Sequence, residues 1–340
     1  MSDEREPLFH VRLLEEVSST NDEVKRALDN GEPEGLVVRA LRQVAGYGRQ
    51  GRAWTSPEGG LYCSLLLRPQ VAPRELPTLS LVVGMAVRRA LVALAGDVAA
   101  DAVRIKWPND VVLVPGRASA GAGAGAADVA LAQNSRYERF SEESAISDLG
   151  FCDSQAVLGA KNRSYRDFCA KLPASSVDTW RDGSADAFAS ATFAASGDSE
   201  PAPAKLCGIS LEAHGGGVCV GVGVNVLPPD ERPDVGGKNR AAYVADLVPV
   251  APPSIEAVLA AFLAAFSPLY DEWARAGFAA LVDEFNAHAS LIGRTVSVVD
   301  RAGSTLAEGV VRRIDAQGRL VLLDASGTEI PVSSGEAHLV

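Results

Sequence analysis

The stretch GYGRQGRAW, residues 46–54, decides how the rest of the chain is interpreted. Its first six residues fit the pattern GxGxxG, which marks a dinucleotide-binding turn only where a helix follows directly. Here the chain continues RAWTSPEGGLYCSLLLRP, in which Pro57 and the glycine pair at 59–60 exclude a helix and LYCSLLL indicates a buried strand. Arg49 and Arg52 add planar, permanently charged donors beside the glycines. The stretch therefore predicts an anion-binding loop and argues against a Rossmann turn.

The composition bounds the class of protein. The 340 residues are 47% hydrophobic, which is enough to bury a full core and predicts two domains. The net charge is −11 and the pI about 5.0, so a nucleic-acid partner is not expected. The start, MSDEREPLF, is polar and does not resemble a signal peptide, and no apolar run is expected to cross a membrane. We therefore expect a soluble cytoplasmic protein with no membrane partner.

The cysteines and histidines give no metal or disulfide pattern. The five cysteines contain no CxxC pair, and those at 63, 207 and 219 lie in strand-like runs, which is typical of reduced, buried thiols. The four histidines lack the spacing of zinc ligands.

Hydrophobic periodicity and turn residues predict a chain that contains both strands and helices. Thr20 and Glu23 form a capping box, so a helix is expected to begin there. Strands are predicted at 9–17, 35–43, 61–67 and 103–114, the last interrupted by Pro108, with a hairpin at 205–226 and helices at 76–94, 254–277 and 279–290. From residue 291 onward, short alternating strands separated by AGS, AQG and ASG predict a small β-barrel.

The domain prediction is residues 1–288 for the main domain and 289–340 for the barrel. The main domain contains an insertion at 115–204, which begins PGRASAGAGAGAAD and ends GDSEPAPA. Both ends are typical of flexible linkers, and scattered aromatics between them show no sustained period. Disorder and a small folded subdomain both remain open, and the first is favoured.

Three segments carry positively charged side chains that are candidates for binding a substrate: GYGRQGRAW, KWPND and KLCG. Lys106 and Lys205, from a total of only six lysines, stand in the second and third. Each alone fits a surface cation on a turn. Together they would neutralise a strongly anionic substrate, such as a carboxylate meeting a triphosphate. Asp110 is compatible with a magnesium ligand or with a simple strand-end cap.

Several motifs follow one another in an order that is far more specific than any one of them alone. SSTN, QxAGxGRxGRxW, KWPND, KLxGI and GVGVN follow one another, and the C-terminal strands end SGEAHLV. This order resembles the biotin protein ligase family, in a short form without an N-terminal DNA-binding domain. The resemblance implies an α+β fold, a mixed β-sheet with flanking helices. This is the class II synthetase-like fold of biotin and lipoate ligases, followed by a small C-terminal SH3-like barrel. It also implies a two-step reaction, in which biotin and ATP form biotinyl-5′-AMP and a lysine of a biotin carboxyl carrier protein then takes the biotinyl group.

The resemblance assigns roles to particular residues of this chain. Catalytic residues would be Arg49, Lys106, Asp110 and Lys205, with Asp110 also the candidate magnesium ligand. Biotin would be bound by Ser19, Thr20, Asn21, Gln43, Gly46, Tyr47, Gly48, Arg49, Lys205 and Gly208. ATP and the adenylate would be bound by Arg49, Arg52, Trp54, Lys106, Gly221, Gly223 and Asn225. The substrates would be ATP and biotin, with magnesium, and a homodimer is left open.

Two departures and several alternatives accompany the resemblance. Tyr47 stands where many relatives carry arginine, which removes one cation from the loop, and the insertion separates KWPND from KLCG, which normally form a short hairpin. A lipoate-type ligase on the same fold and a non-catalytic biotin-binding module remain alternatives. An octanoyl transferase would use a cysteine, and Cys207, flanked by apolar residues, is interpreted as structural. A DNA-binding repressor is not expected.

Overall fold

The computed structural model describes residues 9–114, 203–230, 232 and 240–340. The insertion predicted at 115–204, with the flexibility or small subdomain expected for it, lies outside these residues except for its last two positions. Cys152 and Cys169 also lie outside them.

A seven-stranded sheet forms the centre of the molecule, in the order β1-β2-β3-β7-β6-β5-β4. Its first pair, β1 and β2, is parallel, and every other neighbouring pair is antiparallel, so the predicted mixed sheet is confirmed. The strands are β1 (His10–Val17), β2 (Leu36–Gln43), β3 (Gly60–Leu67), β4 (Val103–Lys106), β5 (Asp110–Leu113), β6 (Ala204–His214) and β7 (Gly217–Asn225).

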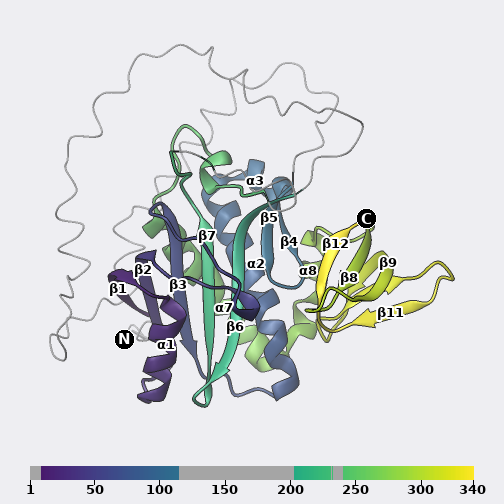
Figure 1. Ribbon diagram of the computed structural model, residues 1–340, viewed down its shortest axis with the longest axis horizontal. Helices are drawn as coiled ribbons and strands as arrows, with labels where there is room; N and C mark the ends of the chain where they lie inside the picture. The colour runs from purple at the N-terminus through teal and green to yellow at the C-terminus, as the bar shows by residue number, and fades with distance from the viewer. Residues whose placement is uncertain (1–8, 115–202, 231, 233–239) are drawn as a thin grey trace, which may run out of the picture.

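Helices cover both faces of this sheet (Figure 1). On one face, α1 (Thr20–Asp29) packs Val24 and Leu28 against Leu66 of β3. On the other face, the longer helices α2 (Leu79–Ala95) and α7 (Ile255–Ala276) pack against each other and against the strands. The short helices α3 (Asp97–Ala102) and α8 (Val282–His288) follow at the β4 edge.

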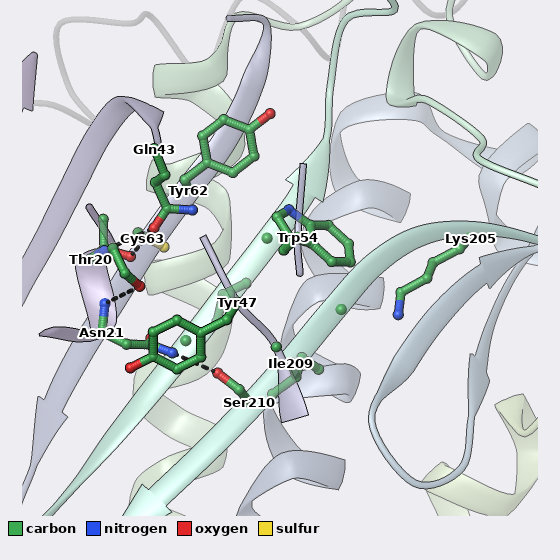
Figure 2. A pocket seen from close by; sticks show the side chains of 16 residues that line it. Thr20, Asn21, Gln43, Tyr47, Trp54, Tyr62, Cys63, Lys205, Ile209 and Ser210 are labelled. Carbon is green, nitrogen blue, oxygen red and sulfur yellow. Dashed lines mark hydrogen bonds between the residues drawn. The ribbon is translucent and has the colours of Figure 1, made fainter. Parts of the chain in front are cut away.

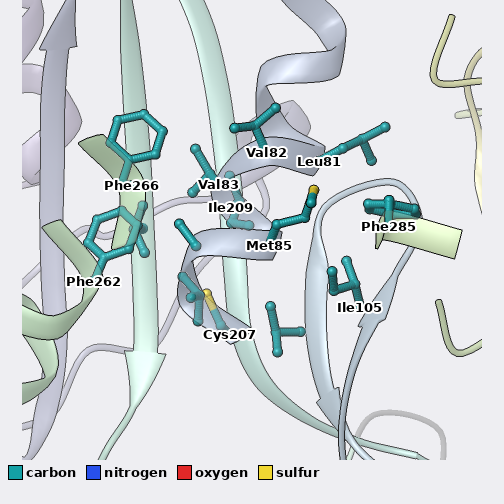
Figure 3. Close-up of a cluster of buried hydrophobic side chains, with 14 of the residues drawn as sticks. Leu81, Val82, Val83, Met85, Ile105, Cys207, Ile209, Phe262, Phe266 and Phe285 are labelled. Atoms are coloured by element: carbon teal, nitrogen blue, oxygen red, sulfur yellow. The ribbon is translucent and has the colours of Figure 1, made fainter. Parts of the chain in front are cut away.

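The larger core lies between the sheet and the α2–α7 pair. Val83 and Met85 of α2 gather with Ile209 of β6 and Phe266 of α7, all almost completely buried (Figure 3). β3 is buried along its whole length, which explains why LYCSLLL is apolar without alternation: both of its faces meet helices.

The hairpin between KWPND and KLCG survives the insertion. β5 pairs antiparallel with β6, with Asp110 opposite Gly208 and Val112 opposite Lys205. The insertion therefore leaves the sheet at the end of β5 and returns at the start of β6. The prediction of one interrupted strand at 103–114 was wrong. The chain turns at residues 107–109, so β4 and β5 are two separate, antiparallel strands.

The C-terminal residues form a second, five-stranded antiparallel sheet in the order β11-β10-β9-β8-β12. Its strands are β8 (Thr295–Val299), β9 (Thr305–Ile314), β10 (Leu320–Leu323), β11 (Glu329–Val332) and β12 (Glu336–Leu339). These ladders show a small antiparallel β unit, whereas closure into a barrel stays a prediction because no ladder joins β11 to β12 in this fully described segment.

Hydrogen bonds fasten this second sheet to the rest of the fold. The indole Nε1 of Trp107 donates to the carbonyl of Gly318 over 3.0 Å. The side chain of Asn286 in α8 both donates to and accepts from the backbone of Ile314, over 2.9 and 2.8 Å. The domain boundary at 288 stays a prediction, since these contacts cross it.

Two local predictions need correction. The N-cap of α1 is Ser19, whose hydroxyl accepts from the amide of Asn21, and not Thr20, whose side chain turns toward the sheet instead. The expectation about apolar runs was also wrong, since the helical stretch Pro73–Ala95 has the length and a hydropathy of 1.7 that fit a membrane span. This stretch is 67% buried inside the fold, which is the usual situation of a core helix.

Candidate active site

A connected set of polar side chains lies where α1 begins, above β3, β6 and β7. Thr20 Oγ1 lies 2.7 Å from Ser64 Oγ, and Ser64 donates to Asn21 Oδ1 over 2.7 Å. Asn21 in turn donates to Ser210 Oγ over 3.1 Å. Gln43 accepts from the Thr20 amide over 2.8 Å, so the end of β2 is part of the same set. Buried polar groups are costly unless they are paired, so this network holds its atoms in fixed directions.

The glycines of β7 make room for this network. A side chain on Gly221 would come within 2.3 Å of Asn21 Oδ1 and 2.4 Å of Ser210 Oγ. One on Gly223 would come within 2.9 Å of the Trp54 ring. The alternation of glycine in GVGVN therefore has a steric cause, because the face of β7 that carries these glycines must stay bare.

Above the network lies a pocket of about 420 Å³, including the part that is open to solvent (Figure 2). Small-molecule sites commonly combine apolar walls with a few fixed polar groups. Trp54 and Tyr62 supply aromatic walls, and Ile209 and Val222 supply aliphatic ones.

Opposite charges gather at the far end of the pocket. Lys205 Nζ lies 2.7 Å from Asp110 Oδ1 and 5.1 Å from the centre of the Trp54 ring. Arg49 donates to Asn109 Oδ1 over 3.0 Å, which brings the tip of the glycine loop to the β4–β5 turn. Burial lowers the pKa of Arg49, and the nearby Asp110 carboxylate opposes that effect. An arginine stays charged under such a shift, so this end of the pocket offers fixed cations to an anionic group.

The glycine loop closes on itself and reaches the second sheet. Its amides bond internally, from Gly48 to the Arg52 carbonyl and from Trp54 to the Gly46 carbonyl, each over 2.8 Å. Arg52 forms an ion pair with Glu336 of β12. Gly46 is buried, and a side chain there would come within 2.7 Å of both Gln43 Nε2 and Ser56 Oγ.

Most predicted binding residues line the pocket, and a second group lies around it. The residues that line it are Ser19, Thr20, Asn21, Gln43, Tyr47, Gly48, Trp54, Lys205, Gly208, Gly221 and Gly223. Gly46, Arg49, Arg52, Lys106, Asp110 and Asn225 are absent from that lining. Lys106 pairs in register with Asp110 across the β4–β5 turn, and Asn225 donates to the Lys205 carbonyl over 3.1 Å. Their predicted roles in catalysis and nucleotide binding stay predictions.

Sequence reasoning missed several participants. Tyr62, Cys63, Ile209, Ser210 and Val222 line the pocket, and Ser64 belongs to the polar network. A signal existed for Ser64, because a serine inside the otherwise apolar LYCSLLL implies a buried polar partner. Ser210 becomes adjacent only through the β6–β7 register, in which it lies opposite Gly221.

Cysteine nucleophiles and a protein-held metal find no support among the described residues. Cys63, Cys207 and Cys219 are buried free thiols, as predicted. Burial raises the pKa of Cys63 to about 12 and that of Cys207 further, which keeps both thiols neutral. Within the described ranges, His, Cys, Asp and Glu side chains form no group of three or more that could hold a metal ion.

Two family models match the chain. The Biotin/lipoate A/B protein ligase family matches residues 13–125, and the Biotin protein ligase C terminal domain matches residues 291–340. The first covers the glycine loop, the KWPND turn and the residues of the polar network that lie in α1, β2 and β3. The second covers the small C-terminal sheet.

Individual proteins that are similar to this chain are named as ligases. The Bifunctional ligase/repressor BirA of Bacillus spizizenii is 39% identical over 105 residues, which are 31% of this chain and 31% of that protein. The Biotin--[acetyl-CoA-carboxylase] ligase of Paracoccus denitrificans is 38% identical over 125 residues, which are 35% of this chain and 51% of that protein. The matches thus span from about a third to about half of the length of these relatives.

A solved structure extends the likeness over the fold. Biotin protein ligase from Aquifex aeolicus, in complex with biotin and ATP, superposes with a TM-score of 0.61 at 21% identity, over 97% of this chain and 98% of that one. At that identity the superposition shows a shared fold. Over residues 13–125 and 291–340, the chain is therefore similar to the biotin/lipoate ligase family and to the biotin protein ligase C-terminal domain, and it shares the fold of a biotin protein ligase.

Proposed function

We propose that this chain is an ATP-dependent biotin protein ligase. It joins biotin and ATP to give biotinyl-5′-AMP and pyrophosphate, and it then transfers the biotinyl group to a lysine of a biotin carboxyl carrier protein, releasing AMP. The observation that carries this proposal is the layout of one pocket: a rigid polar network at one end, aromatic and aliphatic walls between, and the Lys205–Asp110 pair at the other.

The polar end suits the head group of biotin. A ureido ring offers a carbonyl acceptor and N–H donors, so it needs fixed partners of both kinds. Thr20, Gln43 and Ser19 present hydroxyl and amide groups at the pocket lining, held by bonds to Ser64, Ser56 and Asn21. A site built to hydrogen-bond such a ring rejects a ligand that lacks it, because its buried polar groups would be left unpaired.

The charged end suits adenylation. The biotin carboxylate attacks the α-phosphorus of ATP, the bond from that phosphorus to the pyrophosphate oxygen breaks, and negative charge accumulates on the phosphoryl oxygens. Lys205 and Arg49 lie at this end and supply positive charge there. No protein nucleophile is required, because the substrates react with each other once they are aligned.

Transfer needs an amine that has lost its proton. Asp110 is the carboxylate in contact with Lys205, and its side chain is 23% exposed. We assign it to orienting Lys205 and to receiving the proton of the incoming lysine as that amine attacks the acyl-phosphate carbon. AMP leaves with the electron pair of the broken bond. Lys106, across the turn from Asp110, adds positive charge for the phosphates.

Magnesium fits this site as part of the nucleotide substrate, not as a resident ion. The Asp110 carboxylate is already bound to the Lys205 ammonium. The described residues offer no three-ligand group beside it. A hard cation in such a site would be held chiefly by phosphate oxygens and water. Titration of the ligand-free protein with magnesium chloride is expected to give no heat of specific binding, and binding at one site would restore a resident ion.

The partner and the compartment follow from the proposed reaction. The acceptor is a carrier domain that presents a lysine, and the cytoplasm supplies the ATP. An acidic chain with a net charge of −11 is poorly suited to nucleic acid. A homodimer remains open to measurement by light scattering.

The experiment is a comparison of ligands. Pyrophosphate release is measured with ATP plus biotin and with ATP plus lipoate, each followed by incubation with a biotin carrier domain and with a lipoyl domain. Release with biotin, followed by labelling of the biotin carrier, supports the proposal. Release with lipoate and labelling of the lipoyl domain would move the chain to lipoate ligation. Calorimetric binding of biotin without any pyrophosphate would make it a binding module.

A further inference from the structure

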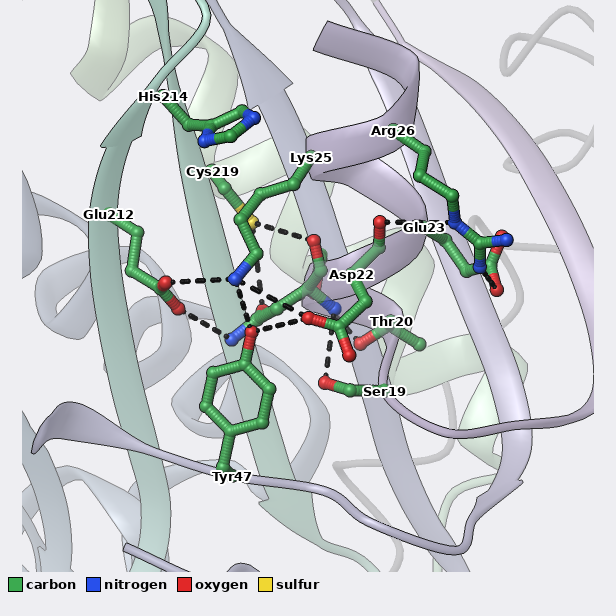
Figure 4. Close-up of polar contacts among 12 residues, drawn as sticks. Ser19, Thr20, Asp22, Glu23, Lys25, Arg26, Tyr47, Glu212, His214 and Cys219 are labelled. Atoms are coloured by element: carbon green, nitrogen blue, oxygen red, sulfur yellow. Dashed lines mark hydrogen bonds and ion pairs between the residues drawn. The ribbon is translucent and has the colours of Figure 1, made fainter. Parts of the chain in front are cut away.

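The tyrosine of the glycine loop is fastened to the helix and the strand beneath it. Its phenol oxygen accepts from Lys25 Nζ over 2.5 Å and donates to Asp22 Oδ1 over 2.7 Å (Figure 4). Lys25 and Asp22 both belong to α1, whereas Tyr47 lies at the start of the loop that borders the pocket. A residue of the loop is thus bonded to a helix that is not part of the loop.

Lys25 extends the attachment to the sheet. Its ammonium lies 3.1 Å from Glu212 Oε2 of β6 and 3.3 Å from Asp22 Oδ1. Glu212 Oε1 accepts from Asn21 Nδ2 over 3.3 Å, which joins this cluster to the polar network of the pocket. We call Asp22, Lys25, Tyr47 and Glu212 the loop latch.

The latch is partly shielded from water, which strengthens it. The side chain of Lys25 is 23% exposed and that of Glu212 is 34% exposed. Burial acts to lower the pKa of Lys25, but its bonds to Tyr47 and Glu212 outweigh burial and the pKa is raised. Burial raises the pKa of Tyr47 to about 12, so the phenol stays neutral and keeps its proton for Asp22. Both bonds of the phenol are therefore charge-assisted, which is the stronger class of hydrogen bond.

The cluster also explains why tyrosine suits this loop. An arginine at position 47 would bring a second cation to the Lys25 ammonium, and like charges at that spacing repel. A neutral phenol accepts from Lys25 and donates to Asp22 at once. Lys25 and Tyr47 are therefore matched to each other across the helix and the loop.

We propose that Tyr47 is a positioning residue which, through Lys25 and Asp22, holds the glycine loop closed over the pocket before any ligand binds. The loop then meets biotin already ordered, and the bound acyl-adenylate escapes only when the latch opens. Preorganisation of this kind strengthens binding mainly by slowing dissociation. The part that concerns the adenylate rests on the proposed function, whereas the closed ligand-free loop does not.

The first test is amide hydrogen exchange in the full-length, ligand-free protein, followed on peptic fragments that span residues 44–56. Tyr47→Phe and Lys25→Met should each raise exchange in this segment about tenfold, because each removes a charge-assisted bond from the closed loop. Lys25→Arg keeps a cationic donor and should restore most of the protection. The matched control is Tyr270→Phe, which removes another phenol bonded to a carboxylate, Glu34 at 2.5 Å, on a different element. Unchanged exchange in both Tyr47→Phe and Lys25→Met would overturn the latch.

The second test is ligand retention. Dissociation of biotin from Lys25→Met should be about tenfold faster, and KM for biotin correspondingly higher, with kcat for adenylation little changed since Lys25 does not line the pocket. Faster exchange with unchanged dissociation would overturn the retention role and leave a purely structural contact. If the wild-type protein made no adenylate, the proposed function would be wrong. Hydrogen exchange and biotin dissociation do not depend on adenylate formation, so they would still test the loop latch.

Discussion

Lys205 and Asp110 face each other across neighbouring strands, with 2.7 Å between the ammonium nitrogen and the carboxylate oxygen. Their sequence positions are separated by the long insertion, but the antiparallel β5–β6 ladder brings the strand ends together. Loop-closure entropy grows only slowly with loop length, so a long insertion at this point leaves the hairpin in place. The pair stands at the end of the pocket where Trp54 and the glycine loop also meet.

Replacing Lys205 with alanine should separate binding from chemistry. The rate of pyrophosphate release should fall by about 100-fold or more, because one preorganised cation is lost from the place where negative charge develops. Biotin should still bind, which calorimetry measures. Arg12→Ala is the control, since Arg12 of β1 is paired with Glu32, does not line the pocket and should leave the rate within about twofold. Normal turnover by Lys205→Ala would remove this lysine from the mechanism.

Ser210→Ala should weaken biotin binding about tenfold, because the Asn21 amide loses one of its two acceptors at the floor of the pocket and keeps only the longer bond to Glu212. Gly221→Ala should weaken binding further, since its new methyl group would displace both Asn21 and Ser210. Ser297→Ala in β8 provides a matched control in the second sheet. Calorimetric titration with biotin, beside a melting curve for each variant, makes the measurement. Equal affinity in all of these proteins would mean that the head group binds elsewhere.

Cys207 should be dispensable. Burial raises its pKa, so the neutral thiol persists and the thiolate needed for nucleophilic attack stays negligible at ordinary pH. Cys207→Ala is therefore expected to keep transfer activity. Alkylation of the native protein at this residue should not rise between pH 7 and pH 9, and it should become fast only in urea. Loss of transfer with intact folding would point to an acyl-thioester route.

Asn286→Ala tests the connection between the two sheets. The amide of Asn286 makes two hydrogen bonds with the backbone of Ile314, so their loss should lower the free energy of unfolding by about 2 kcal/mol. Thermal denaturation should show a fall of a few degrees in Tm for a chain of this size. Gln317→Ala, on the neighbouring turn, is the control. A melting curve for Asn286→Ala identical to that of the wild type would show that these bonds do not couple the sheets.

The order of the elements could be predicted because each has a local signal. Apolar runs bounded by glycine and proline marked the strands, and the apolar periodicity of 254–277 marked α7. The start of α1 was predicted within one residue, but its cap was misassigned because Ser19 and Thr20 are both good caps. Only the tertiary fold shows that the Thr20 hydroxyl is used by Gln43 and Ser64 instead.

The site could be predicted only in part, since the binding residues lie in recognisable motifs and most of the residues that support them do not. Ser64 was detectable as a serine in an apolar strand, but its partners, and the place of Ser210, depend on strand register, which a single sequence does not reveal. The position of Lys25 near the site could have been predicted, because Lys25 follows Asn21 by four positions and so lies on the same face of α1. Its partner Glu212 is 187 residues away, and no local pattern connects the two.

Formation of biotinyl-5′-AMP is best tested by a single turnover with ATP labelled at the α-phosphorus. The protein is mixed in excess with labelled ATP and biotin, and the bound material is separated and identified. We expect the protein to hold labelled biotinyl-5′-AMP. When a biotin carrier domain is added, this adenylate should be converted to AMP and the carrier should gain biotin on a lysine. Bound biotin with intact ATP, or an adenylate that no carrier discharges, would rule out the proposed ligase activity.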